Sequence, residues 1–186
     1  MSEPGPAVRV ALVTAPEARG LDDDLPPLVD ALVHLGASVE MVAWSDERVD
    51  WAGFDLALVR STWDYHRHLD RFRAWIEEAA GRTALHNPPE VLTWNIDKRY
   101  LRDLADAGLP VVPTTFLDPA DPETLDRPPS AGPLLGESGE VVIKPAISAG
   151  ARNTARYLLD DATERARAVA HADSLLREGR VVMAQP

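Results

Sequence analysis

The chain holds only two lysines, Lys98 and Lys144, among its 19 basic residues. Lys144 ends the apolar run 141–143 (VVI), and the loop after it is built from small residues that include Ser148-Ala149-Gly150. Small side chains let backbone N–H groups approach an anion closely, and a lysine adds a compact positive charge. On their own, these residues fit a phosphate-binding loop and an ordinary strand-end turn equally well.

Lys98 closes the segment Trp94-Asn95-Ile96-Asp97-Lys98 and is expected in the first turn of a helix that Asp97 caps. A lysine is unfavourable at this end of a helix, where the dipole prefers acidic residues. Without an anion at the helix end, the position is that of a solvated surface lysine. Because both lysines of the chain occupy such positions, we interpret them as contacts of one shared phosphate.

Strands alternate with helices in the first half, which predicts a parallel sheet with helices on its faces. The Asn-Pro-Pro segment at 87–89 is expected to separate domains 1–88 and 89–186. The expected strands of the first domain are 8–13, 38–44, 55–60 and 84–86, and its expected helices are 25–35 and 69–79.

The second half is expected to be of the α+β type, with several strands and few helices. A helix is predicted over 91–107, a strand over 111–116 and a long loop over 118–139. The remaining elements are strands at 141–144, 155–159 and 180–185, and a helix at 161–178 whose predicted buried side includes Ala162, Ala166, Val169, Ala170 and Leu176.

The motif Asn95-x-Asp97-Lys98, the segment 108–113 (GLPVVP) and the segment 141–145 (VVIKP) resemble the opening of the ATP-grasp fold in their order and spacing. The last strand resembles the one that leads to the adenine hinge of that superfamily. The first half resembles the pre-ATP-grasp domain. The resemblance implies an α/β fold: a parallel-sheet pre-ATP-grasp domain at 1–88, then the first α+β subdomain of an ATP-grasp fold at 89–186, with the second half missing.

The segment Arg60-Ser61-Thr62-Trp63-Asp64-Tyr65 resembles part of the RimK-like ATP-grasp ligases, most closely the cyclo-ligases that close the O-ureidoserine ring in cycloserine biosynthesis. It follows the carboxyl end of a predicted strand, where open α/β sheets bind ligands. Thr62, Trp63 and Asp64 are therefore candidate substrate-binding residues. In the alternative interpretation, Trp63 packs over the sheet edge and Asp64 caps the next helix.

The resemblance implies that Lys98 and Lys144 contact the phosphates of ATP, that the loop Ser148-Ala149-Gly150 closes over them, and that Gln185 meets the adenine. It also implies a carboxylate–amine ligase or cyclo-ligase that forms an acyl phosphate on a small amino-acid-like substrate with ATP and Mg²⁺. In the family, the Mg²⁺ ligands follow the adenine hinge, so they are expected outside this chain, and no catalytic residue is assigned within it. The chain alone is therefore expected to bind ATP weakly and to lack ligase turnover.

The composition of the chain limits the classes of partner that we expect for it. The net charge of −11 disfavours nucleic acid, and the absence of cysteine and of a long apolar run favours a cytoplasmic protein outside membranes. A non-catalytic ATP-grasp remnant, acting as a nucleotide-binding or interaction module, is the alternative function. A half-fold is expected to leave its last strand unpaired, which predicts a homodimer or a completing partner chain.

Overall fold

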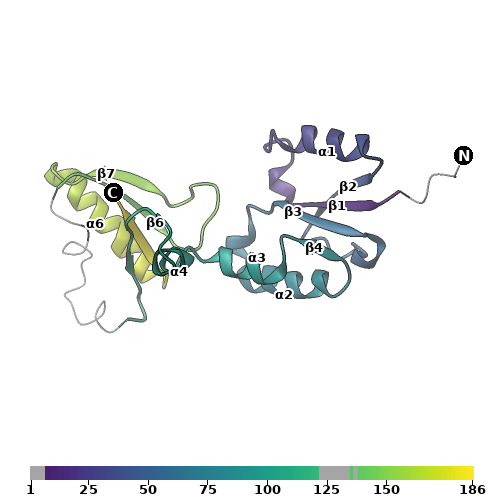
Figure 1. Ribbon diagram of the computed structural model, residues 1–186. Helices are drawn as coiled ribbons and strands as arrows, with labels where there is room; N and C mark the ends of the chain where they lie inside the picture. The colour runs from purple at the N-terminus through teal and green to yellow at the C-terminus, as the bar shows by residue number, and fades with distance from the viewer. Residues whose placement is uncertain (1–6, 122–134, 136–137) are drawn as a thin grey trace, which may run out of the picture. The chain divides into compact units, whose positions relative to one another are not determined.

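The computed structural model describes residues 7–121, 135 and 138–186 (Figure 1). These residues form two compact units, one ending at Trp94 and the other beginning at Asn95. The division falls inside helix α3 (Pro89–Ile96), shortly after the predicted domain boundary at residue 88. Most of the predicted loop 118–139 lies outside the described residues.

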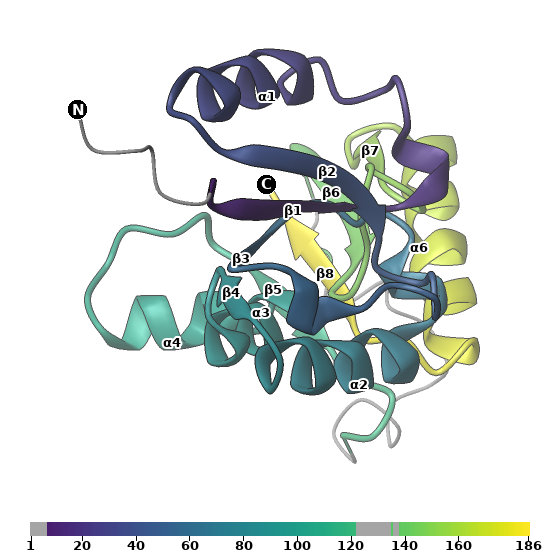
Figure 2. The same ribbon diagram turned by 90° about the vertical axis from the view of Figure 1, so that its right-hand side faces the viewer.

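The first unit is built on a parallel sheet in the order β2-β1-β3-β4, as the alternating pattern predicts. Helix α1 lies on one face of this sheet and helix α2 on the other (Figure 2). The unit consists of β1 (Arg9–Thr14), η1 (Pro16–Ala18), α1 (Leu25–His34), β2 (Ser38–Ala43), η2 (Trp51–Gly53), β3 (Leu56–Ser61), η3 (Tyr65–Arg67), α2 (Leu69–Ala80), β4 (Ala84–His86) and most of α3.

Different side chains fill the two faces of this sheet. Under α1, Val10, Leu12 and Leu25 form an aliphatic cluster. An aromatic cluster brings together α2 and the chain after β2, with the Trp44 and Phe72 rings 5.0 Å apart and the Phe72 and Trp75 rings 5.3 Å apart. The two clusters fix both helices against the strands between them.

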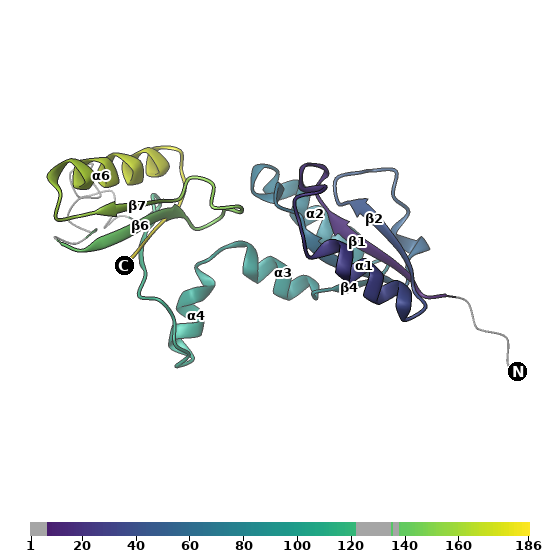
Figure 3. The same cartoon turned by 90° about the horizontal axis from the view of Figure 1, so that it is seen from above.

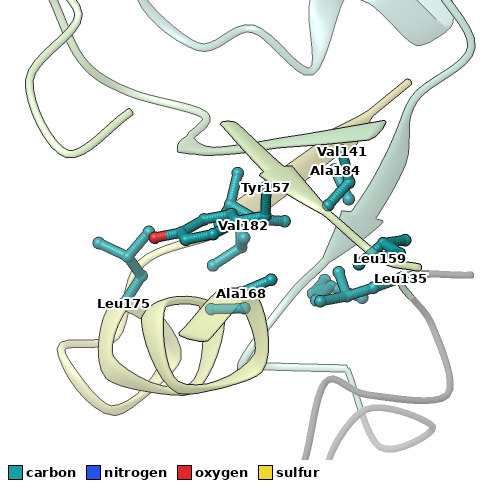
Figure 4. Packing of buried hydrophobic residues seen from close by; sticks show 11 residues of the cluster. Leu135, Val141, Tyr157, Leu159, Ala168, Leu175, Val182 and Ala184 are labelled. Atoms are coloured by element: carbon teal, nitrogen blue, oxygen red, sulfur yellow. The ribbon is translucent and has the colours of Figure 1, made fainter. Parts of the chain in front are cut away.

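The second unit contains an antiparallel sheet in the order β5-β8-β6-β7, with helix α6 packed along one face (Figure 3). The buried side chains of the sheet and α6 form one hydrophobic cluster, which includes Val141, Tyr157, Ala168 and Val182 (Figure 4). The elements are α4 (Tyr100–Asp106), β5 (Thr115–Leu117), β6 (Glu140–Pro145), β7 (Ala155–Leu158), α6 (Ala162–Arg177) and β8 (Val182–Gln185). The α/β fold class predicted from the sequence is thus confirmed.

The prediction that the last strand is left unpaired is wrong. β8 lies inside the sheet, with β5 on one side and β6 on the other, and all four of its residues are buried. The chain before β6 supplies the neighbour that a half-fold was expected to lack. Among the residues that the structure describes, the edges of this sheet are instead β5 and β7.

The single helix predicted over 91–107 is two helices, α3 and α4, separated by a turn at residues 97–99. The Asp97 carboxylate accepts the Arg99 N–H at 3.0 Å, a local bond that competes with helical pairing. The strand predicted over 111–116 begins later, at Thr115. Pro110 and Pro113 lack the N–H that a paired strand needs.

Candidate functional site

Lys144 lies on the face of the antiparallel sheet that α6 does not cover. Its neighbours along β6, Val141 and Ile143, belong to the core under α6, and side chains alternate between the faces of a strand. Lys144 pairs with Met183 of β8, and Val142 pairs with Gln185. Residues directly opposite each other point to the same side, so Lys144 and Gln185 share the face opposite α6, on which Lys144 is half-buried and Gln185 is buried.

Lys98 lies in the turn between α3 and α4 and is bonded to the loop that follows β6. Its backbone N–H donates to the Ala146 carbonyl oxygen at 3.0 Å. Its ammonium donates to the Ser148 carbonyl oxygen at 2.7 Å and to that of Ala146 at 3.3 Å. Two segments 50 residues apart in sequence, each suspected of contacting phosphate, are therefore joined directly.

The two lysines are close enough to affect each other electrostatically. Burial is the main cause that lowers the pKa of Lys98, the charge of Lys144 lowers it further, and the carboxylate of Asp97 opposes both effects. The half-buried Lys144 makes no ion pair or side-chain hydrogen bond within the part of the chain that the structure describes. The site therefore carries a positive charge that no described side chain neutralises.

The loop after β6 has unusual backbone conformations where it turns back toward β7. Gly150 has a φ of 61°, and Ala151 and Asn153 have φ values of 53° and 54°, in the left-handed region that non-glycine residues rarely adopt. Ser148 is buried, and its hydroxyl donates to the Pro145 carbonyl oxygen at 3.3 Å. Ala149 is half-buried and Gly150 is exposed. This arrangement leaves the loop tip accessible and fixes its base beside Lys98.

Gln185 is buried near the end of β8. Its amide Nε2 donates to the Thr114 hydroxyl at 2.8 Å, which ties β8 to the chain just before β5. The side chain thus has a partner within the protein. Contact of Gln185 and its neighbours with adenine stays a prediction.

The substrate candidates Thr62, Trp63 and Asp64 lie in the first unit, directly after β3. Thr62 and Asp64 are buried, whereas Trp63 is 38% exposed. Asp64 accepts the indole N–H of Trp44 at 2.7 Å and forms no side-chain cap on the following helical turn. The capping alternative for Asp64 is therefore wrong, and of these three side chains Trp63 offers the accessible surface.

A polar cluster near Asp64 was missed as a site feature in the sequence. The Ser61 hydroxyl donates to Asp22, and Arg60 forms ion pairs with Asp22 at 3.4 Å and with Asp24 at 2.6 Å. The hydrogen bond from Ser61 is the leading cause of the lowered pKa of Asp22. The sequence signal for this cluster was the aspartate run that includes Asp22 and Asp24, which follows one strand, together with Arg60 at the end of another strand. The parallel sheet places the ends of these two strands at the same edge.

The described residues do not supply a metal site, since no group of three or more His, Cys, Asp or Glu side chains among them is arranged to hold an ion. Magnesium chemistry is therefore not assigned to particular residues. Within residues 7–121, 135 and 138–186, no helix is long and apolar enough to cross a membrane.

Comparison with known proteins shows which proteins this chain is similar to. Residues 10–87 match the family described as D-cycloserine synthetase DcsG, N-terminal domain. The cycloserine biosynthesis protein DcsG of Streptomyces lavendulae is 34% identical over 177 residues, which cover 95% of this chain and 58% of that protein. This chain is homologous to DcsG. A crystal structure of D-cycloserine synthetase DcsG matches 96% of the chain and 59% of its own, with 33% identity and a TM-score of 0.79.

More distant structures share the fold alone. D-alanyl-alanine synthetase A of Vibrio cholerae matches with 15% identity and a TM-score of 0.66, over 97% of this chain and 60% of its own. A carboxyaminoimidazole ribonucleotide synthase of Aspergillus clavatus, complexed with ATP, matches with 13% identity and a TM-score of 0.60, over 97% of this chain and 47% of its own. These structures thus share the fold expected from the sequence, and the chain spans less than two thirds of the length of these relatives.

Proposed function

We propose that this chain forms the N-terminal, nucleotide-binding portion of an ATP-dependent ligase. The observation that carries the proposal is Lys144, a half-buried cation without a counter-ion beside a second lysine. Burying charge without a partner costs free energy, so a position that does so usually serves a ligand. Because the chain as a whole has a net charge of −11, this local positive charge does not reflect a general excess of basic residues on the surface.

The triphosphate of ATP fits this arrangement chemically. Lys98 and Lys144 supply two ammonium groups for phosphate oxygens, and Ser148-Ala149-Gly150 supplies backbone close to them. On the face shared by Lys144 and Gln185, the half-buried Val142 adds an apolar side chain, which suits a base attached to a phosphate chain. The protein's part in phosphoryl transfer is mainly to position the reactants and stabilise charge.

For the complete reaction, we propose that a carboxylate is activated as an acyl phosphate and that an amine or related nucleophile then displaces the phosphate. A small amino-acid-like substrate is favoured by the homology to DcsG, which is described as a cycloserine biosynthesis protein. Thr62, Trp63 and Asp64 are proposed to lie near that substrate, with Trp63 providing the exposed surface. When bound, Mg²⁺ would neutralise phosphate charge. Its ligands would not come from a cluster of three or more His, Cys, Asp or Glu side chains among the described residues.

Calorimetric titration of ATP into the protein tests the nucleotide site. Lys144→Met is expected to weaken binding by about tenfold to a hundredfold, because a hydrogen bond to a charged group contributes roughly 1.5–3 kcal/mol. Arg177→Met, which removes one positive charge from α6, serves as the control and is expected to leave the affinity unchanged. Equal affinities for the wild-type protein and Lys144→Met would contradict the proposal. An affinity lost equally in both variants would reduce the site to general electrostatics.

A further inference from the structure

Two arginines follow the turn at Gly150, and their surroundings differ. Arg156 lies on β7, and its guanidinium forms an ion pair with Glu140 at 3.3 Å. Arg152 lies in the loop before β7 and is exposed. Its side chain forms no ion pair, hydrogen bond or ring contact within the part of the chain that the structure describes. The protein thus balances the charge of Arg156 but not that of Arg152.

An arginine without a partner is uncommon in this chain. Most of the arginines that the structure describes form an ion pair with an Asp or Glu side chain. Others donate to a backbone carbonyl oxygen or lie over an aromatic ring. Among the described residues, Arg19 of the first unit is the other arginine without such a contact. Because the chain has 30 acidic residues against 19 basic ones, acidic partners are plentiful, and the unpaired Arg152 calls for a ligand of opposite charge.

The backbone on both sides of Arg152 has a defined and unusual conformation. Ala151 and Asn153 have φ values of 53° and 54°. Side chains other than glycine rarely adopt this region, and such conformations are frequent at ligand-binding sites. The Arg152 N–H donates to the Ala149 carbonyl oxygen at 3.3 Å, and the Thr154 N–H donates to that of Ala151 at 3.2 Å. Two successive turns therefore fix the point from which the Arg152 side chain leaves the loop.

The order of residues along β6 places this loop beyond Lys144 when the strand is followed from Gln185. Val142, opposite Gln185, precedes Lys144 by two positions on the same face, or about 7 Å along a strand. The loop begins directly after Pro145, where β6 ends. If the base lies near Gln185 and the phosphates near Lys144, as the proposed function has it, a triphosphate extends toward the loop. The phosphate farthest from the base is then the one nearest to Arg152.

We propose that Arg152 binds the terminal phosphate of ATP and that this contact makes the site prefer ATP to ADP. The inference rests on the proposed nucleotide site and adds to it the residue that distinguishes the two nucleotides. A planar guanidinium can donate two parallel hydrogen bonds to phosphate oxygens, which a lysine cannot do. ADP lacks the terminal phosphate, so Arg152 contributes to the binding of ATP alone.

Calorimetric titrations of ATP and of ADP, carried out at one salt concentration, test the role of Arg152. Arg152→Met is expected to weaken ATP binding by about tenfold or more, because it removes a hydrogen bond to a charged group, and to leave ADP binding unchanged. Arg152→Lys keeps the charge but not the paired donors, so it is expected to retain part of the preference for ATP. Arg156→Met is the matched control, since it removes a positive charge that Glu140 already balances. It is expected to change neither affinity. Circular dichroism checks that the variants remain folded.

The outcomes separate this inference from the proposed function. If the wild-type protein binds ATP and Arg152→Met binds it equally well, the role of Arg152 is overturned while the nucleotide site stands. Equal losses for ATP and ADP in Arg152→Met, or the same loss of ATP affinity in Arg156→Met, would also overturn it, because the effect would then be one of general charge. A wild-type protein that binds neither nucleotide would overturn the nucleotide site itself, and the role of Arg152 with it.

Discussion

At the strand ends of the first unit, carboxylates have donors from within that unit. Asp22 is bonded by Ser61 and Arg60, and Asp64 is bonded by the indole of Trp44. On the face of the second sheet opposite α6, the half-buried Lys144 has no such partner among the described residues. The polar side chains at these strand ends of the first unit are thus paired within the protein, whereas Lys144 of the second unit is not paired with a described side chain.

This difference separates stability from binding. A buried polar group that is fully paired holds its element in place, and removing its partner costs free energy. A half-buried ammonium without a partner adds nothing of that kind and gains its partner only when an anion binds. The first unit therefore resembles a self-contained scaffold at these positions, whereas the second unit depends on a ligand at Lys144.

The largest effect on stability is expected at Asp64. Asp64→Ala leaves the buried indole N–H of Trp44 without an acceptor, which is expected to lower the free energy of unfolding by about 1–3 kcal/mol. Urea unfolding measures the change. Asp64→Asn keeps an acceptor oxygen and is expected to lose less. If Asp64→Ala is as stable as the wild-type protein, the paired side chains of the first unit do not stabilise it as argued.

Much of this architecture could be predicted from the sequence. The parallel sheet followed from apolar runs that alternate with helical patterns, and β4 (Ala84–His86) lies where the pattern placed it. The prediction that Lys98 and Lys144 act together rested on the rarity of lysine in this chain. In the structure, the charge of Lys144 contributes to lowering the pKa of Lys98. That they bind phosphate stays a prediction.

The errors arose where long-range contacts override local pattern. β8 was expected to be unpaired because strand neighbours distant in sequence leave no local signal. Ala162, Ala166 and Ala170 were predicted to face the core, but they are exposed, and α6 buries Ala168, Ala172 and Leu175 instead. Alanine is a weak marker of burial in a helix because its high helix propensity suits it to either side. The contacts of Lys98 with the Ala146 and Ser148 carbonyls had no sequence signal at all.

A smaller effect is expected from the titration of Lys98. Burial and Lys144 lower its pKa, so it loses its proton at a lower pH than the ordinary value of 10.5. An anion binds the charged form, so the affinity for ATP is expected to fall as the pH rises through this lowered pKa. The loss is about tenfold if one charged contact of roughly 1.4 kcal/mol disappears. Calorimetry at several alkaline pH values follows it.

Lys98→Arg separates this titration from others in the protein. Arginine stays protonated throughout the range, so the part of the decline that arises at position 98 is expected to vanish. An unchanged decline in Lys98→Arg would assign the titration to another group. It would also show that Lys98 serves only to hold the loop through the Ser148 carbonyl.

The smallest effect is expected at His171, which connects α6 to the far end of the loop after β6. Its Nδ1 lies 3.1 Å from the Tyr157 hydroxyl, and its ring also bonds the backbone of Asn153, a residue with a φ of 54°. His171→Phe keeps an aromatic ring but removes both bonds. The free energy of unfolding is expected to fall by about 1 kcal/mol, as is typical for a net intramolecular hydrogen bond, with a slight loss of ATP affinity.

The pH dependence distinguishes this tether from simple packing. Burial lowers the pKa of His171 below its ordinary value of 6.5, so the unfolded chain binds the proton more tightly than the folded protein does. Stability from the neutral ring is therefore complete above pH 6.5 and falls as the pH drops toward the lowered pKa. Urea unfolding at neutral and mildly acidic pH should show this loss in the wild-type protein and in Tyr157→Phe, which retains the imidazole. The same loss in His171→Phe would show that the titrating group lies elsewhere in the protein.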